Sequence, residues 1–556
     1  MTGSELLEKM LAKRGIITEQ DRETFLNPKY ENMYDPYLMH DMQKTVDRIL
    51  KAIENNERIC IYSDYDADGI PGAVILHDFF KKIQYENFCN YIPHRHSEGY
   101  GVHKEALEGF VREGTKLVIT IDVGITAVEE IAYGNSLGLE IIVTDHHEPL
   151  EVLPNAFAIV NPKLGKGANQ YPDRMLCGSG VIFKVVQAMI VRLPLLAGEG
   201  RGEVGAGWEK WLLDMAGIAT LSDMVPLVNE NRIFAYYGMK VLQKTPRPGL
   251  KALFEKSGIN LNYLTETDIV FSITPKLNAA SRMAHPDDAF KLLATRDMKT
   301  GMIAAEHLAK LNDERKKIVA TIMREVHKKI IARKTDHGLP HVLVMGDPAW
   351  PAGILGLVAS KIIEEYRVTT FVWGSEGESI KGSCRGVGDI SVVKLMQCVS
   401  HLLTQFGGHE EAGGFTTTRE SVHFLEDEFN KSYQETKHEI SKQITEISYD
   451  MELQLSDVTM ENYRALRRMA PFGTGNPKPI FAFKNIIPTS VSQFGKTKEH
   501  LEVCLSPKVR AICWYANPES FTQKIEEGKP MTLLAEFDHS VFRGKEELRL
   551  MIVDVI

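Results

Sequence analysis

Three short apolar segments of this chain each end directly in acidic or imidazole side chains. The segments are residues 59–63, 118–121 and 141–144, and the side chains that follow them are Asp64, Asp66, Asp68, Asp122, Asp145, His146 and His147. Apolar runs of this length, separated by helical patterns, are typical of buried strands in a parallel sheet. Ligands bind beyond the carboxyl ends of such strands, so we expect the three clusters to converge on one crevice.

A crevice that gathers so many carboxylates is unfavourable unless cations lie between them. Carboxylate oxygens combined with imidazole suit manganese or magnesium, and a shared carboxylate can hold two ions side by side. Each residue alone has a simpler interpretation, because an aspartate at a strand end often caps a turn. The joint pattern favours a hydrolytic centre with two divalent ions.

The apolar periodicity predicts an α/β chain with four regions. Between about residues 46 and 160, helix and buried-strand patterns alternate as in βαβ units, which indicates a doubly wound parallel sheet. A long helix over about 297–335 has a basic end and is interpreted as a solvated connector, with a DNA-binding helix as the alternative. A second α/β domain follows, and short alternating strands beyond about 446 indicate a small β-barrel. The predicted domains are residues 1–225 (with a helical lead-in), 226–335, 336–435 and 436–556.

Composition and charge limit the partners, the metal sites and the cellular location that we expect for this chain. A formal net charge of -9 gives no global attraction for a polyanion, so a nucleic-acid partner needs local basic surface and bound metal. The seven cysteines form no C-x-x-C pair, which disfavours a zinc site and a disulfide framework and fits a reduced cytoplasm. The sequence shows no signal-peptide pattern and no apolar run of the ~18 residues that would span a membrane.

Ordered motifs along nearly the whole chain resemble those of the DHH phosphoesterase superfamily. Within it, the chain is most similar to the bacterial single-strand-specific 5′ to 3′ exonucleases. The motifs are Asp64-Tyr65-Asp66-Ala67-Asp68-Gly69, Ile121-Asp122-Val123-Gly124, Asp145-His146-His147, Ser222-Asp223, Asn278-Ala279-Ala280-Ser281-Arg282, Trp350-Pro351-Ala352-Gly353-Ile354-Leu355-Gly356, Gly382-Ser383-Cys384-Arg385, Gly407-Gly408-His409 and Pro471-Phe472-Gly473-Thr474-Gly475-Asn476-Pro477. The resemblance implies a DHH catalytic domain, a DHHA1-like substrate-binding domain and a C-terminal OB fold.

The resemblance also assigns a ligand set for two ions, Mn²⁺ or Mg²⁺. The first ion would be bound by Asp68, Asp122, His146 and Asp223. The second would be bound by Asp66 and Asp122, which makes Asp122 the shared ligand.

One position departs from the superfamily pattern. A histidine often lies four residues before the position of Asp66, where this chain has Tyr62, a poor metal ligand. The second ion would therefore bind more weakly or use Asp64 instead. His147 would not be a ligand and would face the scissile phosphate as an electrophile or acid.

Residues of the later motifs are expected to bind the DNA strand. The resemblance implies that Arg282, Ser383 and Arg385 receive its 5′-phosphate, and a guanidinium fork matches phosphate oxygens. The alternative for Arg282 is an ion pair with an acid between the domains. His409, flanked by glycine, would contact the nucleotide backbone, or would simply form a turn.

The OB-like domain would bind single strands by stacking bases on aromatic rings beside basic groups. Candidate rings are Phe472, Phe494, Trp514, Tyr515 and Phe542, although most rings of a small barrel are core. The expected activity is hydrolysis of single-stranded DNA from its 5′ end to 5′-mononucleotides, in DNA repair and recombination. The expected chain is a monomer, with single-strand-binding protein and a helicase as partners. The alternatives are a phosphodiesterase for short oligoribonucleotides or cyclic dinucleotides, a manganese-dependent inorganic pyrophosphatase, and a catalytically silent single-strand-binding scaffold.

Overall fold

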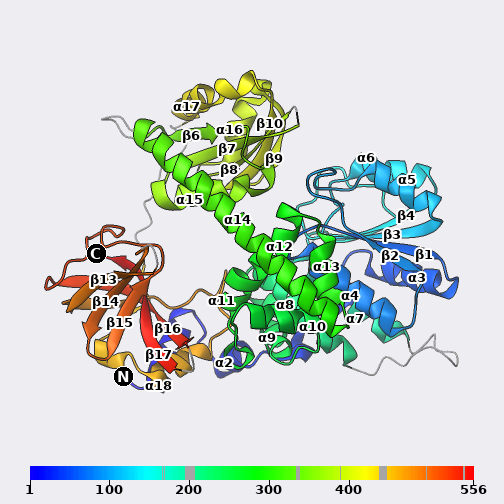
Figure 1. Ribbon diagram of the computed structural model, residues 1–556. Helices are drawn as coiled ribbons and strands as arrows, with labels where there is room; N and C mark the ends of the chain where they lie inside the picture. Colours follow the sequence, from blue (N-terminus) through cyan, green and yellow to red (C-terminus); the bar gives the residue numbers. More distant parts are fainter. Residues whose placement is uncertain are drawn as a thin grey trace.

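The computed structural model shows an open arrangement of three sheet-containing parts around a helical layer (Figure 1). It describes residues 1–556 apart from 166, 168–169, 194–206, 334–338, 378, 389, 437–447, 496–497 and 543–544. None of the described helices combines the length and the apolar composition needed to cross a membrane.

The first part contains the parallel sheet that the sequence predicts. Its strands are β1 (Arg58–Ser63), β2 (Phe88–Tyr91), β3 (Thr115–Ile121), β4 (Glu140–Thr144) and β5 (Ala158–Val160), in the order β2-β1-β3-β4-β5. The strand order reverses between β1 and β3, and this switch point is where a doubly wound sheet opens a crevice for ligands. The first two acidic clusters follow these two strands.

Helices cover both faces of this sheet because its strands are apolar on both sides. One face packs against α3 (Met42–Glu54), α4 (Gly69–Lys82) and α7 (Gly178–Arg192) in the largest core cluster. The other face packs against α5 (Lys104–Arg112) and α6 (Val128–Ser136). Figure 1 shows these two layers on opposite sides of the sheet.

A helical layer joins the first part to the second. It contains α8 (Leu213–Ser222), α9 (Asn229–Leu242), α10 (Pro248–Lys256), α11 (Glu266–Asp268), a π-helical turn (Ile269–Ile273), α12 (Thr274–Met283), α13 (Asp287–Ala294) and α14 (Met298–Arg333). The first half of α14 packs in the core of the first part through Leu308, and its second half packs on the second sheet through Val326. The long helix is therefore a connector with one buried face, and not a fully solvated one.

The second sheet is mixed, in the order β6-β7-β8-β10-β9. Its elements are β6 (Val342–Gly346), α15 (Leu355–Tyr366), β7 (Thr369–Glu376), β8 (Ser379–Arg385), α16 (Val392–Cys398), β9 (Leu403–Gly408), β10 (Ala412–Thr417) and α17 (Leu425–Thr436). Strands β6 and β7 are parallel, whereas β7, β8, β10 and β9 pair antiparallel. This part is the second α/β domain of the predicted fold class.

The C-terminal part is the predicted β-rich domain. Its elements are β11 (Met451–Glu452), α18 (Met460–Arg467), β12 (Phe481–Ile486), β13 (Ser490–Phe494), β14 (His500–Ser506), β15 (Val509–Cys513), β16 (Met531–Phe542) and β17 (Lys545–Val555). The strand order is β11-β12-β16-β17-β15-β14-β13, and strand β14 alternates buried and half-buried residues. One-sided burial of this kind explains the alternating sequence pattern.

The N-terminal helix does not pack where the sequence grouping placed it. We assigned residues 1–225 to one domain with a helical lead-in, but α1 (Gly3–Lys13) packs its apolar face on α18 and the C-terminal core. Gly3 permits close contact, since a Cβ there would lie 3.0 Å from the carbonyl oxygen of Glu461. Helix α2 (Glu19–Leu26) follows and leads the chain towards the first part (Figure 1). Periodicity reveals that α1 has an apolar face, but not which distant segment covers it.

Candidate metal centre and phosphate pocket

Three acids extend the parallel sheet by one further hydrogen bond each. The backbone N–H groups of Asp64, Asp122 and Asp145 donate to the carbonyl of the last residue of the neighbouring strand, at 3.1, 2.9 and 3.1 Å. This pairing fixes the three backbones side by side at the carboxyl edge of the sheet. The strand ends therefore converge as the sequence pattern predicts.

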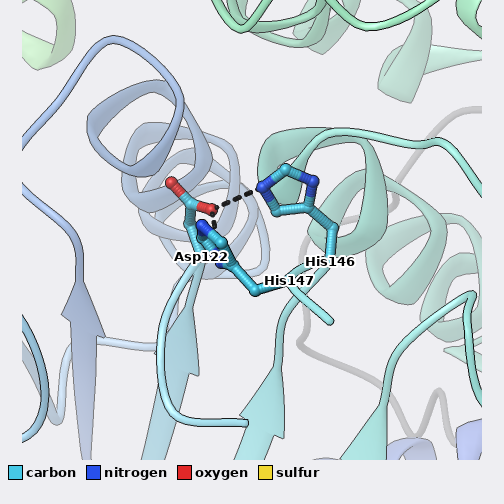
Figure 2. A group of neighbouring side chains, drawn as sticks. All are labelled: Asp122, His146 and His147. Carbon is cyan, nitrogen blue, oxygen red and sulfur yellow. Dashed lines mark ion pairs between the residues drawn. The ribbon is translucent and has the colours of Figure 1, made fainter. Parts of the chain in front are cut away.

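Asp122 lies at the centre of the cluster. Figure 2 shows the rings of His146 and His147 next to one oxygen of its carboxylate. His146 Nε2 lies 3.1 Å and His147 Nδ1 lies 3.8 Å from Asp122 Oδ1. The backbone of Asp122 is in the left-handed region, at φ 62°, which aspartate and asparagine tolerate better than most residues. A Cβ on Gly178 would lie 2.6 Å from the Asp122 Cβ, so only glycine fits behind it.

Asp68 is held by the N-terminus of α7. The backbone N–H groups of Gly178 and Ser179 donate to its two carboxylate oxygens, at 2.6 and 2.7 Å. A helix N-terminus stabilises a carboxylate through its free N–H groups and its dipole. His146 Nε2 lies 3.8 Å from Asp68 Oδ2, so this carboxylate also faces the centre.

Two further predicted ligands border the same space. Asp223 follows the last residue of α8, and its Oδ2 lies 3.9 Å from His146 Nδ1. Its partly buried position and the charges of Asp68 and Asp66 raise the pKa of Asp223 to about 8. Asp66 accepts hydrogen bonds from the backbone N–H groups of Asp68 and Gly69, at 2.8 and 3.1 Å.

The candidate ligand atoms form three overlapping groups, within each of which they lie no more than 4.8 Å apart. These groups are Asp122 with His146 and His147, Asp68 with His146 and Asp223, and Asp64 with Asp66 and Asp122. Asp122 belongs to two of them, as expected for a shared ligand. Tyr62 is not available to the third group, because its hydroxyl donates to the carbonyl of Gly101 at 2.8 Å, and Asp64 occupies that side.

The electrostatics of the cluster fit a bound cation. Asp64 Oδ1 and Asp122 Oδ1 are buried, and in the described part of the chain neither accepts a hydrogen bond. Burial and the neighbouring carboxylates raise the pKa of both groups well above the ordinary range. Divalent ions would satisfy these oxygens and remove the repulsion, and the oxygen-rich donor set suits Mn²⁺ or Mg²⁺.

His147 has a different environment from His146. Its Nδ1–H donates to Asp145 Oδ1 at 2.7 Å, and the same oxygen accepts the backbone N–H of His147. Burial disfavours the imidazolium, but the hydrogen bond and the charge of Asp145 raise the pKa of His147 to about 9. The pKa of His146 is instead lowered, chiefly by burial. At neutral pH His147 is thus a proton donor, whereas neutral His146 can serve as a ligand.

Three of the four predicted DNA-binding residues line one cavity of about 930 Å³ between the two α/β parts. They are Arg282, Ser383 and Arg385. Arg282 donates to the carbonyl of Gly353 at 2.9 Å, and Arg385 donates to the Ser383 hydroxyl at 3.4 Å. His409 is outside this lining, exposed in the turn between β9 and β10, where its backbone N–H bonds Ala412.

Two of the cations that line this cavity are Arg282 and Arg385. Among the described residues, the hydrogen bonds of Arg282 and Arg385 go to Gly353, Ser383 and Cys384, and no carboxylate lies within ion-pair distance of either arginine. The ion pair between the domains that the sequence left open for Arg282 is therefore not formed. Burial and the nearby Arg95 lower the pKa of Arg282 to about 9. The half-buried guanidinium groups of Arg282 and Arg385, which have no carboxylate partner in the described part of the chain, favour an anion such as phosphate. The cavity meets the metal cluster at Tyr100, whose ring lies 6.0 Å from that of His147.

Sequence reasoning missed several residues of the site. Gly178 and Ser179 hold Asp68, and the only signal for them is a Gly-Ser-Gly segment that opens an apolar helix. The sequence indicates no separate role for Asp145 beyond its place in the Asp-His-His motif. It gives no signal for Arg95 and Tyr100, which line the cavity. Their positions depend on the way the two α/β parts face each other.

Comparisons with known proteins agree with this architecture. The DHH family, N-terminal domain, matches residues 58–218, the DHHA1 domain matches 339–436, and the RecJ OB domain matches 449–554. The single-stranded-DNA-specific exonuclease RecJ of Bacillus subtilis (strain 168) is 33% identical over 553 residues, which are 99% of this chain and 67% of the relative. That of Escherichia coli (strain K12) is 27% identical over 573 residues, 99% of this chain and 95% of the relative.

Solved structures show the same fold. RecJ from Thermus thermophilus in complex with Mn²⁺ has a TM-score of 0.80 at 23% identity, covering 99% of this chain and 76% of that one. A second structure, exonuclease RecJ bound to manganese, has a TM-score of 0.60 at 28% identity, covering 71% of this chain and 95% of that one. A parallel-sheet domain with this Asp-His-His strand end, followed by a DHHA1 domain, defines a DHH phosphoesterase. Within that class, the chain belongs to the RecJ family.

Proposed function

We propose that this chain is a metal-dependent exonuclease that hydrolyses single-stranded DNA from its 5′ end to 5′-mononucleotides, in DNA repair and recombination. One observation carries the proposal: a cluster of carboxylates and imidazoles borders a cavity in which Arg282 and Arg385 have no carboxylate partner among the residues that the structure describes. The first feature suits the cleavage of a phosphodiester, and the second suits capture of a terminal phosphate beside it. Relatives named as single-stranded-DNA-specific exonucleases match nearly the whole chain.

In this proposal the predicted residues hold two divalent ions, Mn²⁺ or Mg²⁺. Asp68, Asp122, His146 and Asp223 hold the first, and Asp66 and Asp122 hold the second with the help of Asp64. Ions bound there would make water a stronger nucleophile near neutral pH and offset negative charge at the reacting phosphate. The α7 N-terminus keeps Asp68 in place, and the left-handed backbone at Asp122 points its carboxylate between the two groups.

His147 acts as a proton donor to the scissile phosphate. Its Nδ1 is committed to Asp145, so Nε2–H is the group that can reach an oxygen of the phosphate. Asp145 fixes the ring orientation and keeps the imidazole protonated, which is the second role of such a carboxylate. A protonated imidazole stabilises the charge that develops on the phosphate oxygens during cleavage.

The cavity lined by Arg282, Ser383 and Arg385, called the arginine cavity below, determines the end from which the DNA strand is degraded. Arg282 and Arg385, with the Ser383 hydroxyl, bind the 5′-phosphate, so the first internucleotide phosphate lies towards the metal cluster. His409 contacts the backbone further along the strand. The RecJ OB domain at 449–554 favours a long single strand as substrate over a short oligoribonucleotide or a cyclic dinucleotide, because a dinucleotide needs no such module. A silent scaffold is disfavoured because every acidic and imidazole position of the pattern is kept except the one at Tyr62.

The sequence alone supports three further parts of the proposal. The chain acts as a monomer in the cytoplasm, and single-strand-binding protein and a helicase assist it.

The proposal is tested with purified chain, Mn²⁺ or Mg²⁺, and DNA labelled at either end. We expect mononucleotides to appear first from the 5′ end of single-stranded DNA, with no cleavage of blunt duplex and none in the presence of a chelator. Release from the 3′ end first, or equal cleavage of duplex, would contradict it. Rapid cleavage of dinucleotides with no degradation of long strands would favour the phosphodiesterase instead.

A further inference from the structure

Two cysteines face each other across neighbouring strands beneath the site. Strands β1 and β2 are parallel, and their register pairs Cys60 with Cys89 and Tyr62 with Tyr91. The Tyr62 and Tyr91 rings lie 5.3 Å apart, so both side chains of that pair point to the same face. Because side chains alternate along a strand, the two cysteines point to this face as well.

The spacing of the strands permits a covalent bond between the two thiols. Paired strands lie about 4.7–4.9 Å apart, and a disulfide needs Cα atoms about 4.4–6.8 Å apart. Among the described residues both thiols are free, Cys60 fully buried and Cys89 half-buried. Cys89 lies on β2, the edge strand of the sheet, whose neighbour in the sheet is β1.

The two thiols have complementary reactivity. The adjacent Cys60 thiol and the Arg58 guanidinium lower the pKa of Cys89, although burial opposes them. Burial raises the pKa of Cys60 well above its ordinary value. The accessible thiol is thus the one with more thiolate, which is the reactive form, and the buried thiol is placed to resolve the first product.

We propose that Cys60 and Cys89 are a modification site, at which a hydroperoxide forms a reversible disulfide that slows hydrolysis. The Cys89 thiolate attacks a peroxide oxygen, the O–O bond breaks, and the products are a sulfenic acid and water or an alcohol. The Cys60 sulfur then attacks the Cys89 sulfur, and the S–O bond breaks to release water. The two thiols lose two electrons and the hydroperoxide gains them.

The position of the pair connects it to the catalytic cluster. Strand β1 runs directly into Asp64 and Asp66, and β2 runs into Arg95 and His96 of the arginine cavity. A disulfide needs Cβ atoms about 3.5–4.5 Å apart, so bonding draws the two strands together. Displacement of catalytic groups by about 1 Å costs up to ~10²-fold in rate. The effect on rate rests on the proposed function, whereas the disulfide itself does not.

The test treats the full chain with hydrogen peroxide and removes the peroxide. The chain is then unfolded in guanidinium chloride with N-ethylmaleimide, so that every remaining thiol, the buried Cys60 included, is blocked. The cysteines are mapped by mass spectrometry without reduction. We expect a cross-linked peptide pair that contains Cys60 and Cys89 and is two hydrogens lighter. We expect the nuclease rate to fall about tenfold or more, and dithiothreitol to restore both. Cys89→Ser, with Cys89→Ala as a second variant, should form no cross-link and keep its rate after peroxide. The control Cys398→Ser removes an exposed, unpaired thiol and should behave as the parent chain.

Two results would overturn the inference. One is maleimide on both Cys60 and Cys89 after peroxide, whatever happens to the rate. The other is a complete cross-link with an unchanged rate. If the reduced chain has no nuclease activity at all, the proposed function fails, while the mass measurement still decides whether the pair forms.

Discussion

Replacement of Asp122 by asparagine should separate folding from catalysis. Asparagine keeps the size of the side chain and tolerates the left-handed backbone at φ 62°. It removes a negative charge that two of the three ligand groups share. A unit charge about 4 Å from a cation is worth about 4 kcal/mol at an effective dielectric constant near 20. Since 1.4 kcal/mol is tenfold in rate, we expect hydrolysis to fall by at least about 10³-fold.

The same variant should be more stable than the parent chain without metal. Burial and the neighbouring carboxylates raise the pKa of Asp122 well above its ordinary value of 3.8, so the folded chain without metal disfavours the charged form of this group. Asparagine carries no charge and avoids this cost. We therefore expect the unfolding free energy of the variant to exceed that of the parent at pH 7, with a smaller difference at pH 4.

The assays are urea unfolding without metal and release of mononucleotides from 5′-labelled single-stranded DNA with Mn²⁺. Glu129→Gln is the matched control, because it removes an acid on α6 that is 84% exposed. It should change neither measurement by more than a few tenths of a kcal/mol. Metal-dependent hydrolysis close to the parent rate in Asp122→Asn would refute the assignment of the shared ligand.

Three further outcomes follow from the geometry and the charges. Arg282→Ala should lose its preference for a 5′-phosphorylated over a 5′-hydroxyl end, and an unchanged ratio of kcat/KM for the two ends would count against the phosphate cavity. The pKa of His147 is raised to about 9, so the hydrolysis rate should fall as the pH rises above that value. His147→Gln should remove this alkaline decrease, and a variant that keeps the decrease would show that another group causes it. Trp514 and Tyr515 are 44% and 79% exposed, and alanine at both should weaken binding of long single strands by about 1–3 kcal/mol per lost stacking contact while sparing short ones; equal weakening for both lengths would argue against stacking there.

The stability of the metal-free chain should also depend on pH in an unusual direction. The pKa of Asp223 is raised to about 8, and those of Asp64 and Asp122 are raised too. An acid whose folded pKa exceeds its unfolded pKa keeps its full contribution below the unfolded value and loses it as pH rises through the folded one. Unfolding free energy should therefore fall between pH 5 and 8, and Mn²⁺ should stabilise the chain more at pH 8. A metal-free chain that becomes more stable over this interval would contradict the crowding of carboxylates.

The catalytic cluster could be predicted from sequence because its acids follow strands of one parallel sheet. The position of Asp122 after β3 and of Asp145 after β4 depends only on strand order and on the common edge where parallel strands end. The hydrogen bonds that hold Asp68 could not be predicted in this way, since their donor Gly178 lies 110 residues further along the chain. Local patterns do not contain such a contact.

The packing of α1 on the C-terminal part could not be predicted from the sequence for the same reason. Leu6 and Met10 give the helix an apolar face, but many apolar surfaces could cover such a face. The exposure of His409 is another example, because a glycine-flanked histidine reads equally as a ligand contact or as a turn. In both cases the missing information is tertiary packing between distant segments.

Anomalous diffraction at the manganese edge, from crystals of the chain grown with Mn²⁺, tests the central claim most directly. We expect two peaks within the cluster, one bounded by Asp68, Asp122, His146 and Asp223 and the other by Asp64, Asp66 and Asp122. A manganese-loaded crystal with no peak among these residues, or with its peak at another site, would contradict the account.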